Sequence, residues 1–515
     1  MALVARLLER AQCGAHHEVL LLAEESLREP TGDIADGEPG MHFVRFVALV
    51  VQGRSTEALG AIELMLAAAE RDDSQGWRSC ALSTRAHQLL RLGDQLKDDV
   101  GAALQDLVDA ELALLGGEED SVVAENAHTG IALGYHQLRL YELALPQYQA
   151  AYAVNAQHGL PAANRTMWQG NMATLHLEWA LELYRVKEVA EAELHTLAAG
   201  AHAARAFEEA CGPDAEAFRE DALLLAACAA AEGPDPAGAA RSIERYAAVL
   251  AARGQRIEVA FCWPFLAVAL RRAGEHKRAM QVIERAVTEL PADAGWLTTA
   301  AVHHTRAILL ADEGGLAATA ALAYGDSLAQ ALWRQRQGTL KTATTMKSYD
   351  RLRSEHARVE RTAETDSLTK VANRRAFDRV VESIGDSGDD RRVAVLLVDV
   401  DDFKRVNDTR GHAVGDSVLQ AVAGVLTAEV RDCDMVARIG GDEFVVLLPG
   451  ASATAAHLVA KRMAQVISTL AAGAIQVTAS IGVASGPVCG VTGTMQAADA
   501  AMYVAKRAGG NRAQV

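Results

Sequence analysis

Two adjacent carboxylates on a glycine turn are the residues of this sequence best suited to chemistry. Asp442 and Glu443 follow a Gly-Gly pair, and the apolar segments 435–439 and 444–448 beside them predict two short buried strands. Two glycines permit the positive φ angles of a tight hairpin, and their bare backbone lets a triphosphate approach closely. Acidic residues also solubilise exposed turns. Alone, the hairpin is compatible with a metal and phosphate site or with a solvated turn.

A second polar group, upstream in the chain, favours the metal and phosphate site. The apolar run 393–400 predicts a buried strand whose end carries Asp399, followed by Asp401 and Asp402. Hard divalent cations take oxygen ligands and usually share one or two carboxylates with substrate phosphates. A carboxylate at a strand end and another on a neighbouring hairpin would form such a half-cage, as in two-metal phosphoryl-transfer sites. The two segments together predict a site for Mg²⁺ or Mn²⁺.

The order of motifs over residues 364–512 resembles the GGDEF-type diguanylate cyclases, which join two GTP molecules into cyclic di-GMP and release pyrophosphate. Six blocks carry the likeness, whereas the hairpin alone would be weak evidence. They are 366–369 (Asp-Ser-Leu-Thr) with 373–375 (Asn-Arg-Arg), the block at Asp399, 411–416 (Gly-His and Gly-Asp), the hairpin 440–444, 479–483 and 498–506. The resemblance implies an α+β domain with a mainly antiparallel sheet flanked by helices, similar to nucleotidyl cyclase and polymerase palm domains.

The same resemblance implies a role for each matching residue. Asp399 and Asp442 would hold the metal through their side chains, and Val400 would add its carbonyl oxygen. Glu443 would activate the ribose 3′-hydroxyl, either as a general base or through a metal, because a carboxylate beside two cations is a poor base. The substrate-binding residues would be Asn407 and Asp416 at the guanine edge, the backbone N–H groups of Phe403 and Lys404 beside the phosphates, and the charge of Lys506. Retention of Asp416 favours GTP over ATP.

One further motif predicts regulation, and three positions depart from the family pattern. Arg431 and Asp434 keep the register of the family's inhibitory Arg-x-x-Asp motif, so we expect cyclic di-GMP to bind there and inhibit. An arginine can stack on a guanine and fork to it while the aspartate accepts a hydrogen bond. Lys370 and Ala372 replace a frequent glycine and proline, which should alter only a loop. Gly510 replaces a frequent phosphate-binding arginine, which weakens the expected grip on the triphosphate.

Residues 1–325 predict repeated helix pairs. They are rich in alanine and leucine with helical spacing, and short polar or Gly/Pro connectors interrupt them. Two windows match the tetratricopeptide pattern: Trp263, Leu266, Ala267, Leu270, Ala279, Ile283, Ala286 and Pro291, and more partially Ile131, Ala132, Tyr135, Ala144, Tyr148 and Ala151. The region thus resembles a tetratricopeptide-like solenoid, although such helices also occur in other all-α proteins. A solenoid offers a concave groove for a peptide, a protein or a small molecule.

Residues 326–364 lack proline and contain one glycine, so they predict a long helix. An apolar seam at three- and four-residue spacing could pair with its twin in a coiled coil, although a solvated connector helix stays open. The seam comprises Tyr349, Leu352, His356, Val359 and Ala363. Pairing would matter chemically, because each ribose 3′ oxygen must attack the α-phosphorus of the other GTP. A site that holds one GTP cannot do this alone, so the resemblance implies an aligned homodimer.

Charge and cysteine usage exclude several classes of protein. The net charge is −17, and residues 365–515 hold 17 acidic and 16 basic side chains, whereas the first 364 hold 50 and 34. This distribution argues against a nucleic-acid partner, which needs a clustered basic face. Seven scattered cysteines without a Cys-x-x-Cys pair indicate reduced thiols, and no apolar run is long enough for a membrane span. We therefore expect a cytoplasmic protein.

These observations together predict a multidomain protein. A tetratricopeptide-like all-α solenoid would occupy 1–325, a helical linker 326–364, and a GGDEF domain 365–515. The predicted function is a diguanylate cyclase that acts as an aligned dimer and is controlled by the helical domain and by its product. The alternatives are a non-catalytic receptor for GTP or cyclic di-GMP, a tetratricopeptide scaffold, and a polymerase-like nucleotidyltransferase.

Overall fold

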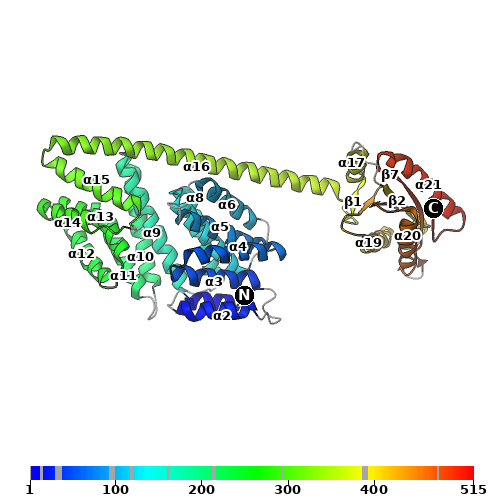
Figure 1. The fold of residues 1–515 in the computed structure, drawn as a ribbon, viewed down its shortest axis with the longest axis horizontal. Coiled ribbons are helices and arrows are strands. Elements are labelled where there is room, and N and C mark those ends of the chain that lie inside the picture. The colour runs from blue at the N-terminus through cyan, green and yellow to red at the C-terminus, as the bar shows by residue number, and fades with distance from the viewer. Residues whose placement is uncertain are drawn as a thin grey trace. The chain divides into compact units, whose positions relative to one another are not determined.

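The computed structural model divides the chain into two compact units, Met1–Arg351 and Leu352–Val515 (Figure 1). The residues it describes are 2–11, 15–28, 37–91, 99–115, 120–158, 162–210, 216–292, 294–385, 392–472 and 475–515. Within these ranges every helix is too short or too polar to span a bilayer.

The N-terminal unit is built from helices, which confirms that this part of the chain is all-α. The helices are α1 (Ala2–Arg10), α2 (His16–Arg28), α3 (Glu38–Val51), α4 (Ser55–Arg71), α5 (Gln75–Arg91), α6 (Asp99–Leu114), α7 (Ser121–Gln137), α8 (Tyr141–His158), α9 (Ala162–Arg185), α10 (Val189–Glu209), α11 (Glu216–Ala229), α12 (Pro236–Ala252), α13 (Arg256–Arg272), α14 (His276–Glu289) and α15 (Trp296–Asp312). A 3-10 turn, η4 (Ala230–Glu232), follows α11.

The two windows with tetratricopeptide spacing each form a helix pair. The first window spans α13 and α14, and the second spans α7 and α8, with three-residue connections in each case. The small and large residues of the pattern interlock, since Ala279 and Ile283 in one pair and Tyr135 and Ala144 in the other have no exposed surface. The prediction of helix pairs is confirmed at both windows. Assignment of the unit to the tetratricopeptide class stays a prediction.

A single long helix, α16 (Leu316–Glu364), covers the whole of segment 326–364. A buried arginine fixes its first half to the N-terminal unit. Arg336 donates from Nη2 to Glu142 Oε2 at 2.5 Å and from Nε to the carbonyl oxygen of Arg139 at 2.5 Å. Its guanidinium also lies over the rings of Tyr141 and Trp333. A buried charge needs such partners, so this half of α16 is a packed part of the unit. The role of 326–364 as a linker stays a prediction.

The C-terminal unit contains a mainly antiparallel six-stranded sheet in the order β1-β3-β4-β2-β7-β8, as predicted (Figure 1). Its strands are β1 (Ala372–Asn373), β2 (Arg392–Val400), β3 (Met435–Arg438), β4 (Glu443–Pro449), β7 (Ala479–Pro487) and β8 (Arg512–Gln514), while β5 (Ala471–Ala472) and β6 (Ile475–Gln476) form a separate pair. The helices are α17 (Arg374–Gly385), α18 (Phe403–Arg410), α19 (His412–Ala428), α20 (Ala453–Ile467) and α21 (Val491–Arg507), with a 3-10 turn, η5 (Val488–Gly490).

The central strand β2 is buried on both faces, and its alternation decides which helix each side chain meets. Leu396 and Val398 belong to the core formed with α19 and α20. Val395 and Leu397 belong to the opposite core, formed with α17 and α21. Because side chains alternate along a strand, Asp399 follows Val395 and Leu397 onto the face covered by α17 and α21.

Cys80, Cys228, Cys262 and Cys433 form no disulfide among the described residues. Cys80, Cys228 and Cys262 are buried in the helical unit, and Cys433 is exposed. These findings agree with the reduced thiols expected from the sequence. Cys13, Cys211 and the side chain of Cys489 lie outside the described residues.

Candidate active site

The end of β2 and the start of β4 lie side by side and bring the predicted carboxylates together. Asp399 is directly opposite Glu443 in the antiparallel ladder, so the two side chains project from the same face of the sheet. The Val400 N–H donates to the carbonyl oxygen of Asp442 at 3.2 Å, which fixes the glycine turn against the strand end. The structure therefore unites Asp399, Val400, Asp442 and Glu443 at one edge.

The backbone conformation of the Gly-Gly pair differs from the sequence prediction. Neither Gly440 nor Gly441 has a φ in the left-handed region, so the prediction of positive angles is wrong. The pair instead leaves space, because a Cβ atom at position 440 would lie 2.5 Å from Glu443 Oε2. The turn closes through the N–H groups of Ile439 and Gly440, which donate to the carbonyl oxygen of Glu443 at 3.0 and 3.3 Å.

Lys506 is the basic partner of this carboxylate group. It lies on α21, the helix that covers the face onto which Asp399 projects, and its Nζ is 2.6 Å from Asp399 Oδ2. Burial raises the pKa of the Asp399 carboxyl, the Lys506 ammonium opposes that shift, and the charges of Asp442 and Glu443 add to it. The site thus holds more negative charge than one lysine balances, which favours a second cation.

A divalent metal fits the donors of this edge. Among the described residues, no three Asp, Glu, His or Cys side chains are grouped as a metal site. Magnesium, however, needs only one or two protein carboxylates, because water and substrate phosphates supply its other oxygen ligands. Asp399, Asp442 and the carbonyl of Val400 are oxygen donors of this kind. Their predicted role as metal ligands is compatible with the geometry.

Helix α18 begins at Phe403, after the two residues that follow Val400, and contains the residues predicted to face the phosphates. Asp402 precedes the helix with φ 53°. The N–H groups of Phe403 and Lys404 are in the first turn, where helix geometry leaves such groups without intrahelical acceptors. The ring of Phe403 packs against the core, while Lys404 is exposed. Phe403 therefore has a packing role, and its backbone stays available for an anion.

The residues predicted to read guanine meet where α18 and α19 adjoin. Asn407 is half-buried on α18, and Asp416 is exposed on the first turns of α19. Gly415 is the contact point between them, since a Cβ atom there would lie 1.9 Å from Asn407 Oδ1. The glycine allows the Asn407 amide to lie against α19, beside Asp416.

The C-terminal unit also matches a known family directly. Residues 363–512 match the family model described as diguanylate cyclase, GGDEF domain. This part of the chain is a GGDEF domain. MucR of Pseudomonas aeruginosa, named a bifunctional diguanylate cyclase/cyclic di-GMP phosphodiesterase, is 45% identical over 154 residues, which cover 28% of this chain and 22% of MucR. The diguanylate cyclase TpbB of the same species is 40% identical over 166 residues, covering 30% and 38%.

Solved structures show similar matches. The coiled coil and GGDEF domain of DgcB from Caulobacter crescentus, in complex with c-di-GMP, is 30% identical, and the match covers 34% of this chain and 96% of that chain with a TM-score of 0.31. The chain spans about a fifth of MucR and about two fifths of TpbB. The likeness to these curated proteins therefore concerns the GGDEF domain.

The GGDEF domain contains a tether at Asp401 that the sequence did not reveal. Asp401 accepts hydrogen bonds from the hydroxyls of Ser480 at 2.6 Å and Thr478 at 2.8 Å, and from the N–H of Asn511 at 2.9 Å. Its carboxylate is thus engaged by three donors of the domain. Gly510, with φ 70°, packs its backbone against the same carboxylate. Asp401 joins the end of β2 to the segment that follows Lys506.

A second unpredicted contact links the start of the GGDEF domain to the glycine turn. Arg438 donates from Nη1 to both carboxylate oxygens of Asp366, at 3.1 and 3.3 Å, and from Nη2 to the carbonyl oxygen of Gly441 at 2.7 Å. Asp366 also accepts hydrogen bonds from the N–H and hydroxyl of Thr369. Arg438 lies two residues before Gly440, and this closeness in the chain was the sequence signal that could have predicted the contact.

The predicted inhibitory motif of the GGDEF domain forms a closed turn. The N–H of Arg431 donates to Asp434 Oδ2 at 2.9 Å, and the N–H of Asp434 donates to the carbonyl oxygen of Arg431 at 2.9 Å. Asp434 is half-buried, and Arg431 is exposed. The turn presents the arginine to solvent, and its role in product binding stays a prediction.

Proposed function

We propose that this chain is a diguanylate cyclase that condenses two GTP molecules into cyclic di-GMP and two pyrophosphates. The observation that carries the proposal is the meeting of Asp399, Asp442 and Glu443 at one edge of a GGDEF domain. The name of TpbB, a curated relative, supports the same activity.

The chain's own residues would mostly position the substrate and balance its charge. Asn407 and Asp416 would hold the guanine, the start of α18 would face the phosphates, and Lys506 would contribute its ammonium group. Glu443 would accept or orient the proton of the attacking 3′-hydroxyl. GGDEF cyclases use divalent metal ions. Such an ion, held by Asp399, Asp442 and Val400, would neutralise phosphate charge.

The reaction requires two GGDEF domains that face each other, and the proposal therefore includes a homodimer. On α16 the side chains of Tyr349 and Leu352 are each 66% exposed, so two apolar positions of the predicted seam are available for pairing. The side chains of Val359 and Ala363 lie outside the described residues. Control by the helical unit would then act through the alignment of the two domains.

The decisive experiment is to incubate the purified full-length chain with GTP and Mg²⁺ or Mn²⁺ and to measure cyclic di-GMP. Glu443→Gln should reduce the rate at least about a hundredfold, because it removes proton acceptance while keeping the side chain's size. If wild type makes no product, the assay is repeated with a dimer enforced through α16. If the enforced dimer also makes no cyclic di-GMP, the proposal is refuted.

Product inhibition is tested separately. Arg431→Ala should relieve inhibition at micromolar-scale cyclic di-GMP while the initial rate stays the same, because the exposed arginine is outside the carboxylate edge. The matched control is Arg462→Ala, which removes an exposed arginine paired with Glu429 instead. An unchanged progress curve for Arg431→Ala would remove the regulatory proposal.

A receptor for GTP or cyclic di-GMP is the second candidate, because Gly510 replaces the arginine that the family resemblance implies. Binding of either nucleotide without turnover by the enforced dimer would favour it.

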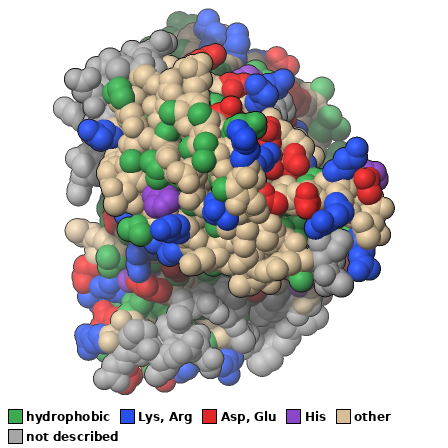
Figure 2. Space-filling view, turned by 90° about the vertical axis from the view of Figure 1, so that its right-hand side faces the viewer, with side chains coloured by type: hydrophobic (Ala, Val, Ile, Leu, Met, Phe, Trp, Pro, Cys, Tyr) green, Lys and Arg blue, Asp and Glu red, His purple; other side chains and the backbone are tan. Residues whose placement is uncertain are grey.

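A nucleic-acid polymerase is disfavoured, since the described Lys and Arg side chains on the face drawn in Figure 2 are interspersed with Asp and Glu.

A further inference from the structure

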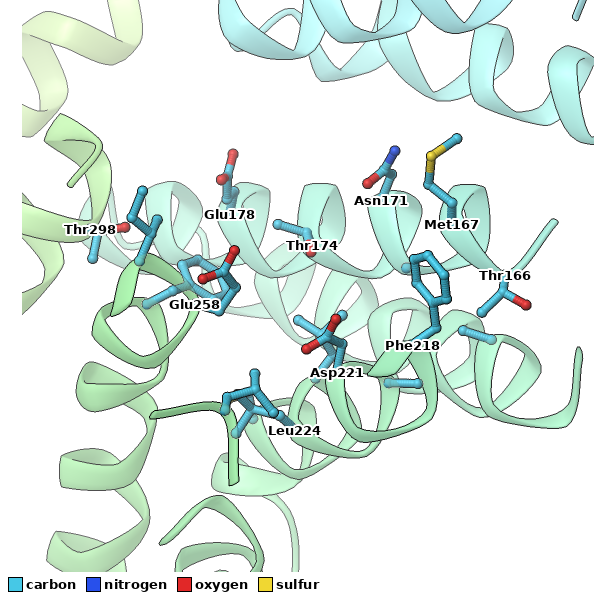
Figure 3. Close-up of a pocket in the computed structure, with 18 of the residues that line it drawn as sticks. Thr166, Met167, Asn171, Thr174, Glu178, Phe218, Asp221, Leu224, Glu258 and Thr298 are labelled. Atoms are coloured by element: carbon cyan, nitrogen blue, oxygen red, sulfur yellow. The ribbon is translucent and has the colours of Figure 1, made fainter. Parts of the chain in front are cut away.

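A cavity of about 430 Å³ lies within the N-terminal unit, where α9, α11 and α13 meet (Figure 3). Its volume is in the range of sites for small organic ligands. Met167 of α9 and Phe218 and Leu224 of α11 supply apolar lining. Phe218 is 37% exposed and Ile257, also in the lining, is 44% exposed. The cavity therefore offers apolar and aromatic surface that the protein itself leaves uncovered.

The charged groups of the cavity are all acidic. Glu178, Asp221 and Glu258 of the lining come from α9, α11 and α13. In Figure 3 the Glu178 carboxylate points away from those of Asp221 and Glu258. None of the described lining residues is Lys, Arg or His. The nearby Arg253 is engaged by Glu220 at 2.5 Å, and Glu178 contacts His136. Asp221 and Glu258 thus remain as negative charges without a basic partner in the lining.

Two polar atoms of the lining lack a hydrogen-bond partner among the described residues. They are Asp221 Oδ1 and the hydroxyl oxygen of Thr166, a residue that is only 2% exposed. Buried polar atoms are normally satisfied, and an unsatisfied one is costly. Burial raises the pKa of the Asp221 carboxyl to about 6, with Glu258 and Glu220 adding to the shift and Arg253 opposing it. A ligand that donates a hydrogen bond and carries positive charge would satisfy Asp221.

We propose that this cavity binds an organic ammonium cation with an apolar body, such as an arylalkylamine. The ammonium group donates to Asp221, and the apolar body lies on Phe218 and Leu224, where an aromatic face also attracts a cation. A bare metal ion fits less well, because it would gain nothing from the apolar and aromatic side chains of Phe218 and Leu224. An anion would be repelled. The binding does not depend on the cyclase activity proposed above.

The first test uses the full-length chain and direct binding by isothermal titration calorimetry at pH 7.5. The probes are phenethylamine and its neutral counterpart 2-phenylethanol. We expect phenethylamine to bind at one site and 2-phenylethanol to bind at least about tenfold more weakly, because it lacks the charge. Equal binding of the two, no binding of phenethylamine, or displacement of phenethylamine by MgCl₂ at matched ionic strength would overturn the proposal.

Variants locate the site. Asp221→Asn should weaken phenethylamine binding at least about tenfold, and Glu258→Gln, which is exposed and safe for folding, should weaken it about threefold. Glu313→Gln, at the exposed end of α15, is the matched control and should bind as wild type does. Circular dichroism checks that each variant is folded. Wild-type affinity in both Asp221→Asn and Glu258→Gln would overturn the assignment.

The pH profile gives a second readout. Phenethylamine stays protonated between pH 5 and 7.5, so its affinity should fall as the pH drops through about 6, where Asp221 takes up a proton. Asp221→Asn should flatten this profile. A wild-type profile without that fall would contradict the role of Asp221.

Discussion

Replacing Gly482 with alanine should displace α21 from the sheet of the GGDEF domain. A Cβ atom at this β7 position would lie 1.9 Å from the carbonyl oxygen of Ala498 and 2.3 Å from the backbone nitrogen of Met502. Both atoms belong to the backbone of α21, so the clash is relieved only when the helix moves. Overpacking lowers the free energy of unfolding by about 1–3 kcal/mol and occasionally more. Because this clash is with helix backbone, we expect a loss of about 3 kcal/mol.

The expected loss can be measured as stability and as turnover. For a unit of this size, about 3 kcal/mol lowers Tm by roughly 6–12 °C, which scanning calorimetry of the full-length chain resolves. Because α21 carries Lys506, whose ammonium is 2.6 Å from Asp399, a shift of about 1 Å should also reduce cyclic di-GMP synthesis about a hundredfold.

Gly493→Ala is the matched control for this substitution. Gly493 lies on the same helix, and a Cβ atom there meets nothing within 4 Å. Alanine also favours a helix over glycine by about 1 kcal/mol, so this variant should be at least as stable as wild type. A Gly482→Ala protein that melts and turns over like wild type would refute the close packing of α21 on β7.

Two further predictions concern the same domain. Gly415→Ala should push the Asn407 amide aside and raise KM for GTP about tenfold. Tm should change little, since the atoms that the new Cβ meets belong to side chains, those of Asn407 and, at 3.2 Å, Phe403; steady-state kinetics that match wild type would contradict this. Burial raises the pKa of the Asp366 carboxyl, but hydrogen bonds from Thr369 and Arg438 outweigh it and leave the pKa below its ordinary value. This contribution to stability is therefore present above pH 4 and is lost as the pH falls through the lowered pKa, so thermal melts at pH 3 to 6 should show a smaller acid loss for Asp366→Asn.

The sequence predicted the strands of the site well, because their signal is local. The apolar run 393–400 corresponds to β2, and the glycine turn separates β3 from β4 as expected. The short turn sets the antiparallel register of β3 and β4. The pairing of β2 with β4, which brings Asp399 opposite Glu443, joins segments distant in the chain and was expected only from the metal and phosphate hypothesis. The family blocks added the start of α18 and the α18–α19 corner, whose residues lie close together in the chain.

Contacts that depend on helix docking could not be read from the sequence. The pairing of Lys506 with Asp399 requires α21 to cover one particular face of β2, and the apolar residues on both faces look alike. The role of Asp401 depends on Thr478 and Asn511, which reach it only after the sheet has formed.

In the helical unit, too, local features could be predicted from the sequence and long-range contacts could not. Periodicity predicted its helices, but Arg336 and Arg139, which fix α16, are 197 residues apart in the chain. The cavity at Asp221 likewise forms only where α9, α11 and α13 pack together, and no sequence motif in these helices predicts it.

The contact between Lys506 and Asp399 means that the carboxylate group carries its own counterion. In the proposed reaction a triphosphate would offer the ammonium a second anionic partner, so substrate binding would exchange one ion pair for another. This internal counterion makes the Asp399 carboxylate a weaker attractant for other cations. The same side chain would thus have two roles, as the counterion of Asp399 and, in the proposed reaction, as a partner of the triphosphate.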